Sequence, residues 1–405
     1  MAIFQEVISY YVSSGSNVYT MLLDCSKAFD RVSYQVLFPK LLERGLCPLW
    51  AKLYWKIYQQ NVLNVRWAGE HGRNFQMRNG VKQGGIASPK LFTLYIDGLF
   101  VELEKSGCGC KMNNEYFGII GYADDIVLMA PDKETLNRML EICNKYARDH
   151  CLIFNAAKSQ FIIFGDHTEK ETIMFNGVTL ECVDKVKYLG STICAPYGCI
   201  DSQCVLFEYA VKVNAVNNVF KNLPFDIRLK MSTCFAGSLY GAELVKLSEF
   251  FLTRLDVTWR KGVRKTISIP YRSCSKVLPV LTGNFGLRES LFYKCLNFYK
   301  RMCNSDEKKY INVTNYIKTG SQSNLAENFR YLCNFMQCYQ CNMDFLNGKK
   351  KHQLKEMFLK KEVLNEETDR LAVFTREILS ERDYIKMFFT VKECNYILNE
   401  ILVCN

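Results

Sequence analysis

GYADDIVLMA, residues 121–130, places two adjacent carboxylates, Asp124 and Asp125, between two apolar runs. The flanking runs, YFGII at 116–120 and IVLM at 126–129, are rich in the β-branched and aromatic residues that suit buried strands. The pattern predicts a β-hairpin with the acids at its turn. Turn preference does not explain them, because two-residue hairpins favour Asn-Gly or Asp-Gly. Adjacent like charges repel and a divalent ion relieves the repulsion, so the pair indicates a cation site, with a solvated acidic turn as the alternative.

A third carboxylate, Asp24, follows the apolar run YTMLL at 19–23, and the next residues, CSKAFDR at 25–31, are expected to begin a helix. If this strand lies beside the hairpin, Asp24 meets the paired acids. Oxygen ligands without clustered His or Cys suit Mg²⁺ rather than zinc. Two such ions can stabilise the attacking and leaving oxygens of an in-line phosphoryl transfer.

NGVKQGGIASP, residues 79–89, reads as a glycine-rich loop that runs into a helix, with Ser88 as N-cap and Pro89 in the first helical position. Gly84 and Gly85 leave room for a ligand to approach the backbone, and the Gln83 amide can both donate and accept hydrogen bonds. A plain turn is the alternative for this loop.

Two later segments carry basic residues at strand ends. NAAKS, residues 155–159, precedes a predicted strand at 160–164 and places Lys158 near the end of the sheet. KVKYLGS, residues 185–191, predicts a strand and turn whose basic and aromatic side chains can contact a nucleic-acid backbone. A surface position is the alternative for Lys158.

Bulk composition is that of an ordinary globular protein, with 49% hydrophobic and 23% charged residues among 405. The net charge of +11 makes a polyanionic partner such as nucleic acid plausible. The N-terminus lacks a signal-peptide pattern and no run approaches about 18 apolar residues, so we expect a soluble, intracellular protein with no membrane partner. Nucleus and cytoplasm are not distinguished.

The chain changes character near residue 205. Before it, short apolar strands alternate with helices, which predicts an α+β fold; after it, helical periodicity dominates, for example at Leu252, Leu255 and Trp259. Cys338-x-x-Cys341 has metal-like spacing, with Cys333 and His352 nearby, but a second pair is missing and a zinc site is not expected.

Five ordered segments closely resemble the palm motifs of reverse transcriptases from non-LTR (LINE-type) retrotransposons. They are LDCSKAFDRV (23–32), NGVKQGGIASPKLFTLYIDGL (79–99), GYADDIVLMA (121–130), NAAKSQFIIF (155–164) and KYLGS (187–191). The resemblance implies a polymerase palm over 1–205, an antiparallel sheet packed on helices. A helical thumb-like region over 206–300 and a helical C-terminal region of unknown role over 301–405 would follow.

The resemblance also implies roles for individual residues. It makes Asp24 and Asp124 the principal ligands of two Mg²⁺ ions, which Mn²⁺ could replace, and Asp125 the auxiliary ligand. Lys158 would be a proton donor to pyrophosphate. The other implied positions line the substrate and primer sites: Phe29 would block a ribose 2′-hydroxyl, Gln83, Gly84, Gly85 and Tyr122 would line the nucleotide pocket, and Tyr188, Leu189 and Gly190 would be the primer grip.

The function expected from the resemblance is RNA-directed DNA polymerisation, with an RNA template, a DNA primer and deoxynucleoside triphosphates as partners. The family's fingers subdomain and N-terminal endonuclease are missing from this sequence, so a truncated copy is expected. The alternative is a catalytically inactive remnant that only binds nucleic acid. A nucleotide cyclase with a palm fold is disfavoured by the Gln83 loop in series with Lys158 and Tyr188. Oligomeric state is left open.

Overall fold

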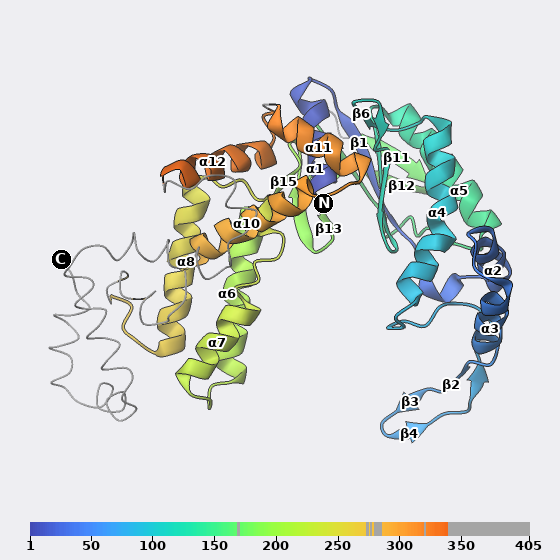
Figure 1. Ribbon diagram of the computed structural model, residues 1–405, viewed down its shortest axis with the longest axis horizontal. Helices are drawn as coiled ribbons and strands as arrows, with labels where there is room; N and C mark the ends of the chain where they lie inside the picture. Colours follow the sequence, from blue (N-terminus) through green and yellow to red (C-terminus); the bar gives the residue numbers. More distant parts are fainter. Residues whose placement is uncertain (168–170, 273–274, 276–277, 279–285, 320, 339–405) are drawn as a thin grey trace. The chain divides into compact units, whose positions relative to one another are not determined.

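The computed structural model describes residues 1–167, 171–272, 275, 278, 286–319 and 321–338 (Figure 1). These residues form two compact units, Met1–Cys199 and a second that begins at Ile200, and each is described by itself. The Cys338-x-x-Cys341 spacing and His352 lie outside the residues whose side chains are described.

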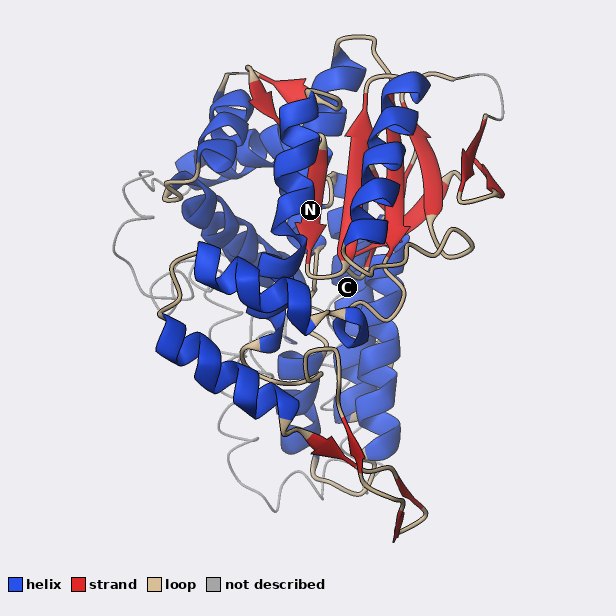
Figure 2. Ribbon diagram, turned by 90° about the vertical axis from the view of Figure 1, so that its right-hand side faces the viewer, coloured by secondary structure: helices blue, strands red, loops and turns tan. Residues whose placement is uncertain are grey.

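A four-stranded antiparallel sheet forms the centre of the first unit (Figure 2). Its strand order is β10-β1-β9-β8. Its strands are β1 (Val18–Asp24), β8 (Ile119–Tyr122), β9 (Asp125–Ala130) and β10 (Gln160–Phe164). Strand β1 pairs with β9 on one side and with β10 on the other. Motifs that are far apart in the sequence are therefore neighbours in the sheet.

Successive side chains of each strand point to opposite sides of the sheet, and both sides are apolar. One face belongs to the core shared with α2 (Tyr34–Glu43), α4 (Ser88–Ser106) and α5 (Lys133–Asp149), and includes Met21, Leu23 and Leu128. The opposite face packs on α1 (Ala2–Ser13), whose Phe4 ring meets Phe164 edge-on at 5.8 Å between centroids. Both faces are covered, which explains why β9 is almost uninterrupted in apolar residues.

Smaller elements complete the first unit. They are η1 (Phe29–Arg31), α3 (Pro48–Gln59), β2 (Val62–Leu63), β3 (Arg66–Trp67), β4 (Glu70–His71), β5 (Phe75–Gln76), β6 (Lys111–Met112), β7 (Glu115–Tyr116), β11 (Thr172–Phe175), β12 (Val178–Glu181), β13 (Lys185–Tyr188), β14 (Ser191–Cys194) and β15 (Cys199–Ile200). Helix α5 begins at a capping side chain, since the Asp132 carboxylate accepts from the Thr135 backbone N–H at 2.7 Å.

The predicted α+β class, the hairpin around the paired acids and the strand at 160–164 are confirmed. Two local predictions were wrong. Residues 25–31 form a bridge, a turn and one 3₁₀ turn rather than the start of an α-helix. Ser88 does not cap α4: its hydroxyl donates to the Lys82 carbonyl at 2.5 Å instead, because the loop folds back over the helix start.

Helices joined by loops make up nearly all of the described part of the second unit. Its elements are α6 (Ser202–Val219), α7 (Phe225–Phe235), η2 (Ala242–Leu244), α8 (Glu249–Ile267), α10 (Leu287–Cys303), α11 (Lys308–Lys318) and α12 (Asn324–Cys338). The predicted boundaries at 205 and 300 fall inside α6 and α10, and the three-region division stays a prediction. None of the helices in the described ranges combines the length and the apolarity that a bilayer crossing needs.

Trp259 on α8 belongs to the interior of this unit, with 7% of its surface exposed. Its neighbour Arg264 is also buried and donates to the Ser275 hydroxyl at 2.8 Å. Of the basic residues around Trp259, Arg254, Lys261 and Lys265 are exposed. Lys265 is engaged with the Asn214 side chain at 2.6 Å.

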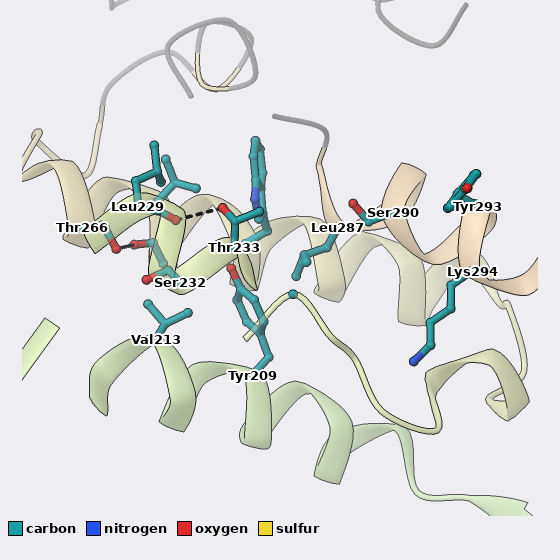
Figure 3. Close-up of a pocket in the computed structure, with 14 residues that line it drawn as sticks. Tyr209, Val213, Leu229, Ser232, Thr233, Thr266, Leu287, Ser290, Tyr293 and Lys294 are labelled. Atoms are coloured by element: carbon teal, nitrogen blue, oxygen red, sulfur yellow. Dashed lines mark hydrogen bonds between the residues drawn. The ribbon is translucent and has the colours of Figure 1, made fainter. Parts of the chain in front are cut away.

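A cavity of about 200 Å³ lies among α6, α7, α8 and α10 (Figure 3). Tyr209, Ser232 and Trp259 are among its lining residues. The buried Ser232 hydroxyl has no hydrogen-bond partner among the described residues. In contrast, the Thr266 hydroxyl donates to the Gly262 carbonyl and accepts from the Asn217 amide, both at 3.0 Å.

Replacing these two hydroxyls should change stability in opposite directions. Ser232→Ala removes a buried polar atom without a partner, so we expect it to raise the free energy of unfolding by up to about 1 kcal/mol. Thr266→Val keeps the shape but deprives the Asn217 amide of its acceptor, and should cost about 1–3 kcal/mol. Urea unfolding of both variants measures the difference, and a loss in Ser232→Ala would contradict the expectation.

Candidate active site

Strand register brings two of the three carboxylates directly opposite each other. Asp24 is the last residue of β1 and Asp125 the first residue of β9, and they are Cα partners in the antiparallel ladder. Directly opposed residues project from the same face of a sheet with Cβ atoms about 4.5–5.5 Å apart. The alternation assigns both acids to the α1 face, opposite to Leu23 and Ile126.

Asp124 occupies the turn that joins β8 to β9. Tyr122 and Asp125 are paired, which leaves Ala123 and Asp124 as the two central residues of the hairpin. Ala123 has a φ of 55°, in the left-handed region, while Asp124 is not in that region. A single positive φ at the first central position is the signature of a type II′ turn, where glycine is usual. The alanine therefore holds a strained backbone immediately before the acids.

Gly121 is required by the packing behind this turn. A Cβ at this position would lie 2.5 Å from the Phe100 ring of α4. The ring therefore rests against bare backbone on β8. Helix α4, which follows the glycine-rich loop, supports the acidic hairpin in this way.

The three carboxylates repel one another, and this repulsion contributes to the pKa of Asp125. Partial burial, followed by the charges of Asp124 and Asp24, raises the pKa of the Asp125 carboxyl above its usual range. Burial and the same two carboxylates raise the pKa of the adjacent Cys25 thiol to about 12. The thiol is therefore neutral at physiological pH, and the negative charge is confined to the acids.

Asp125→Asn should consequently stabilise the ligand-free protein at neutral pH. A carboxyl whose pKa is raised on folding destabilises the fold above that pKa, and the penalty disappears as pH falls toward the unfolded value of about 3.9. We expect a higher thermal midpoint for the variant at pH 7 and a shrinking difference toward pH 4. Added Mg²⁺ should raise the wild-type midpoint more than that of the variant. A midpoint lowered at pH 7 would show that the repulsion is absent.

The donor set fits Mg²⁺, but the side chains are not gathered as ligands. Among the described residues, no three carboxylate, imidazole or thiol side chains converge on a point where one ion could be held. All three acids nevertheless end or flank neighbouring strands, and they supply only oxygen donors. The three carboxylates are therefore neighbours in the sheet without forming a ready-made ligand set in this structure.

The segment that carries Lys158 is tied to the end of β1. The Asn155 backbone N–H donates to the Asp24 carbonyl at 2.8 Å, and the Asp24 N–H donates to the Ser159 hydroxyl at 3.2 Å. Lys158 itself is exposed and forms no ion pair within the described part of the chain. The segment that carries Lys158 thus lies at the end of the sheet, bonded to the backbone of Asp24, and the role of Lys158 stays a prediction.

The glycine-rich loop is anchored to the segment after Asp24. The Val81 N–H donates to the Phe29 carbonyl and the Gly80 N–H to the Val32 carbonyl, each at 2.8 Å. Beyond this anchor Gln83 is exposed, and Gly84, with a φ of 78°, has no atom within 4 Å of the point where a Cβ would lie. Gly85 is partly buried where its N–H returns to the Lys82 carbonyl at 3.0 Å.

Phe29 is half-buried and stacks on Phe92 of α4, with 5.2 Å between ring centroids and 19° between planes. That contact fixes the ring beside the anchored loop. Tyr122 is 68% exposed at the end of β8. Of the two aromatic residues implied for the nucleotide site, Tyr122 is therefore exposed and Phe29 is only partly exposed.

The predicted primer-grip residues form the turn between β13 and β14. Leu189 and Gly190 both have positive φ, 46° and 79°, as a type I′ turn requires. Tyr188 is buried, its ring meets Phe4 of α1 at 5.7 Å, and its hydroxyl has no partner among the described residues. Burial and the charge of Asp125 raise its pKa. The exposed part of this turn is consequently Gly190, not the tyrosine.

Sequence reasoning missed Ser159, Gly80 and Phe100, which hold the candidate residues in place. Ser159 was only the residue after Lys158, and Gly80 only the residue after Asn79. The sequence offered only two weak signals for them: the hydroxyl of Ser159 beside a basic turn, and the glycine at the entry of the Gln83 loop. Neither reveals a partner 50 to 135 positions away.

Most of the first unit matches a known protein family. The family model described as "Reverse transcriptase (RNA-dependent DNA polymerase)" matches residues 4–193. A Pol polyprotein from the type-1 retrotransposable element R2 of Nasonia vitripennis is 32% identical over 125 residues, which is 30% of this chain and 12% of that protein. The type-2 element R2DM of Drosophila melanogaster has a Pol polyprotein 30% identical over 182 residues, 42% of this chain and 17% of that protein.

Among solved structures, telomerase from Candida tropicalis in complex with a telomeric RNA fragment is similar over 96% of this chain and 51% of that chain. The TM-score is 0.41 and the identity 13%. The chain spans less than a fifth of the length of the two R2 proteins. Residues 4–193, which include the central sheet and all three carboxylates, match a reverse transcriptase domain, and this part of the chain is similar to the Pol proteins of R2 retrotransposable elements.

Proposed function

We propose that this chain adds deoxynucleotides to a primer 3′-hydroxyl under the direction of an RNA template. The observation that carries the proposal is the direct pairing of Asp24 with Asp125 across β1 and β9, with Asp124 in the adjoining turn. Three carboxylates on neighbouring strand ends have little structural use, since each destabilises the others. They are what a site for divalent cations and phosphates requires.

Asp24 and Asp124 would be the principal ligands of two Mg²⁺ ions, and Asp125 the auxiliary one. When bound, such ions stabilise both the attacking and the leaving oxygens of an in-line displacement. The chain's own contribution is positional: the ladder between β1 and β9 fixes the strand ends, and the Phe100 contact at Gly121 supports the turn. Mn²⁺ could replace Mg²⁺ because it accepts the same oxygen ligands.

The substrate site would lie between the Gln83 loop and Phe29. Gln83, Gly84 and Gly85 would approach the incoming nucleotide, with Tyr122 across from them. The stacking of Phe29 on Phe92 supports a steric role for this ring, because a ring held by a neighbour can exclude a ribose 2′-hydroxyl. We infer a deoxynucleoside triphosphate as the substrate.

Lys158 would donate a proton to the leaving pyrophosphate, a step that typically contributes about 10²–10⁴-fold to a rate. Its exposure and its lack of an ion pair among the described residues support a mobile side chain. Tyr188, Leu189 and Gly190 would support the primer end, with the buried tyrosine fixing the turn and Gly190 offering its backbone. The net charge of +11 supports association with both template and primer.

Primer extension on a defined RNA template tests the proposal. The 405-residue chain with Mg²⁺ or Mn²⁺ should incorporate the deoxynucleotides that the template specifies, and omission of the template should abolish incorporation. Salt-sensitive binding of primer and template without incorporation would instead support a binding-only protein. A cyclic nucleotide formed without template or primer would identify a cyclase.

A further inference from the structure

Strand β10 stops pairing with β1 just before Asp24, the last residue of β1. Leu22 is the partner of Gln160, and the next bridge joins Cys25 to Phe154. Residues 155–159 are looped out opposite Leu23 and Asp24. The loop contains Lys158, so a regular strand partner for Asp24 has been replaced by the turn that presents the proposed proton donor.

A side chain replaces the missing ladder bond. The Asp24 N–H donates to the Ser159 hydroxyl at 3.2 Å, while the Asp24 carbonyl accepts from the Asn155 N–H at 2.8 Å. Both backbone groups of Asp24 on this edge are thus satisfied by the two ends of one loop. Only the Ser159 bond depends on the identity of a side chain.

The same hydroxyl closes the loop. Ser159 Oγ donates to the Asn155 carbonyl at 2.8 Å, and that carbonyl also accepts from the backbone N–H groups of Ser159 at 3.0 Å and Lys158 at 3.2 Å. Ser159 is 5% exposed, so water does not readily replace these contacts. One buried hydroxyl therefore connects the Asp24 backbone to the fold of the Lys158 turn.

We propose that Ser159 is a positioning residue that holds Asp24 and the Lys158 turn in register with each other. The inference rests on the proposed polymerase function. Asp24 would hold a metal ion, and Lys158 would protonate the leaving pyrophosphate. A change in their separation affects the chemical step more than nucleotide binding.

Ser159→Ala, Ser159→Thr and the wild-type chain should be compared in primer extension. We expect kcat of the alanine variant to fall about 10–100-fold with KM for the deoxynucleotide within about threefold. The Mg²⁺ concentration for half-maximal rate should rise, and the basic limb of the pH–rate profile should shift. Ser159→Thr retains the hydroxyl and should recover kcat to within about threefold of the wild type.

Ser323→Ala is the matched control for stability. Ser323 is 2% exposed in the second unit, and its hydroxyl likewise accepts from a backbone N–H, that of Ala326 at 3.0 Å. It should lose stability in urea unfolding without a change in kcat or in Mg²⁺ dependence. Hydrogen exchange of the peptide that contains Asp24 should quicken in Ser159→Ala and stay slow in Ser159→Thr.

The possible outcomes distinguish the proposed polymerase function from the positioning role of Ser159. A wild-type chain that extends no primer overturns the proposed function. An active wild type whose Ser159→Ala variant keeps its kcat, its Mg²⁺ dependence and the protection of Asp24 overturns the positioning role alone. So does a threonine variant that folds and protects Asp24 yet is as slow as the alanine variant.

Discussion

Asp124→Asn should reduce template-dependent primer extension at least about 100-fold while leaving primer–template binding intact or slightly tighter. The carboxylate lies at the hairpin turn beside the Asp24–Asp125 pair, where it would share two Mg²⁺ ions with Asp24. Loss of a principal ligand removes charge stabilisation worth several kcal/mol in the transition state. Binding improves because one negative charge near the phosphate backbone is removed.

Single-turnover extension and a filter-binding titration at matched salt measure the two effects. Asp306→Asn, a change of the same kind at an exposed position of the second unit, serves as the control and should alter neither quantity. If Asp124→Asn extended primers at the wild-type rate, the paired acids would be excluded as the metal site.

Gly80→Ala should be among the most destabilising alanine substitutions in the first unit. Gly80 has a φ of 93°, and a Cβ there would lie 2.9 Å from the Asp30 Cα and the Asp30 carbonyl oxygen. Backbone atoms cannot move aside as a flexible side chain can. The strain of the left-handed conformation, about 1–2 kcal/mol, therefore adds to a steric clash, and we expect a total loss of about 2–4 kcal/mol.

Gly177→Ala isolates the conformational part of this effect. Gly177 has a φ of 78° in the turn between β11 and β12, with nothing within 4 Å of a Cβ position. The Gly177→Ala substitution should lower the free energy of unfolding by only about 1 kcal/mol. Urea unfolding of both variants gives the comparison. Equal losses would show that the Gly80 loop tolerates displacement from Asp30, and that the anchor between the glycine-rich loop and the Phe29 segment is weak.

The central sheet was accessible from sequence because its strands are apolar runs bounded by polar turns. β1 and β10 were predicted within one residue, and the hairpin with its acids was confirmed. The sequence did not show that the strand ending at Asp24 lies beside the hairpin, because the order and register of strands are set by tertiary pairing. The ordered motifs supplied the family, which the match over residues 4–193 bears out.

Features that depend on a distant partner were not accessible. The side-chain bond from Ser159 to Asp24 spans 135 positions, and the serine is an ordinary polar residue in the sequence. Ser88 was expected to cap α4 because residue type and position favoured it, but the Lys82 carbonyl competes for its hydroxyl. Tyr188 was expected in the primer grip, and its burial against Phe4 follows from α1, which no local pattern connects to β13.

Cleavage of the backbone by hydroxyl radicals from bound Fe²⁺ reveals where a divalent ion sits on this protein, since the cuts fall next to the ion. The measurement uses the full chain with primer, RNA template and deoxynucleoside triphosphate. We predict cuts next to Asp24 and at Asp124–Asp125, both suppressed by excess Mg²⁺ and lost in Asp124→Asn. Cuts confined to other parts of the chain, with template and primer bound, would contradict the assignment of these carboxylates as the metal site.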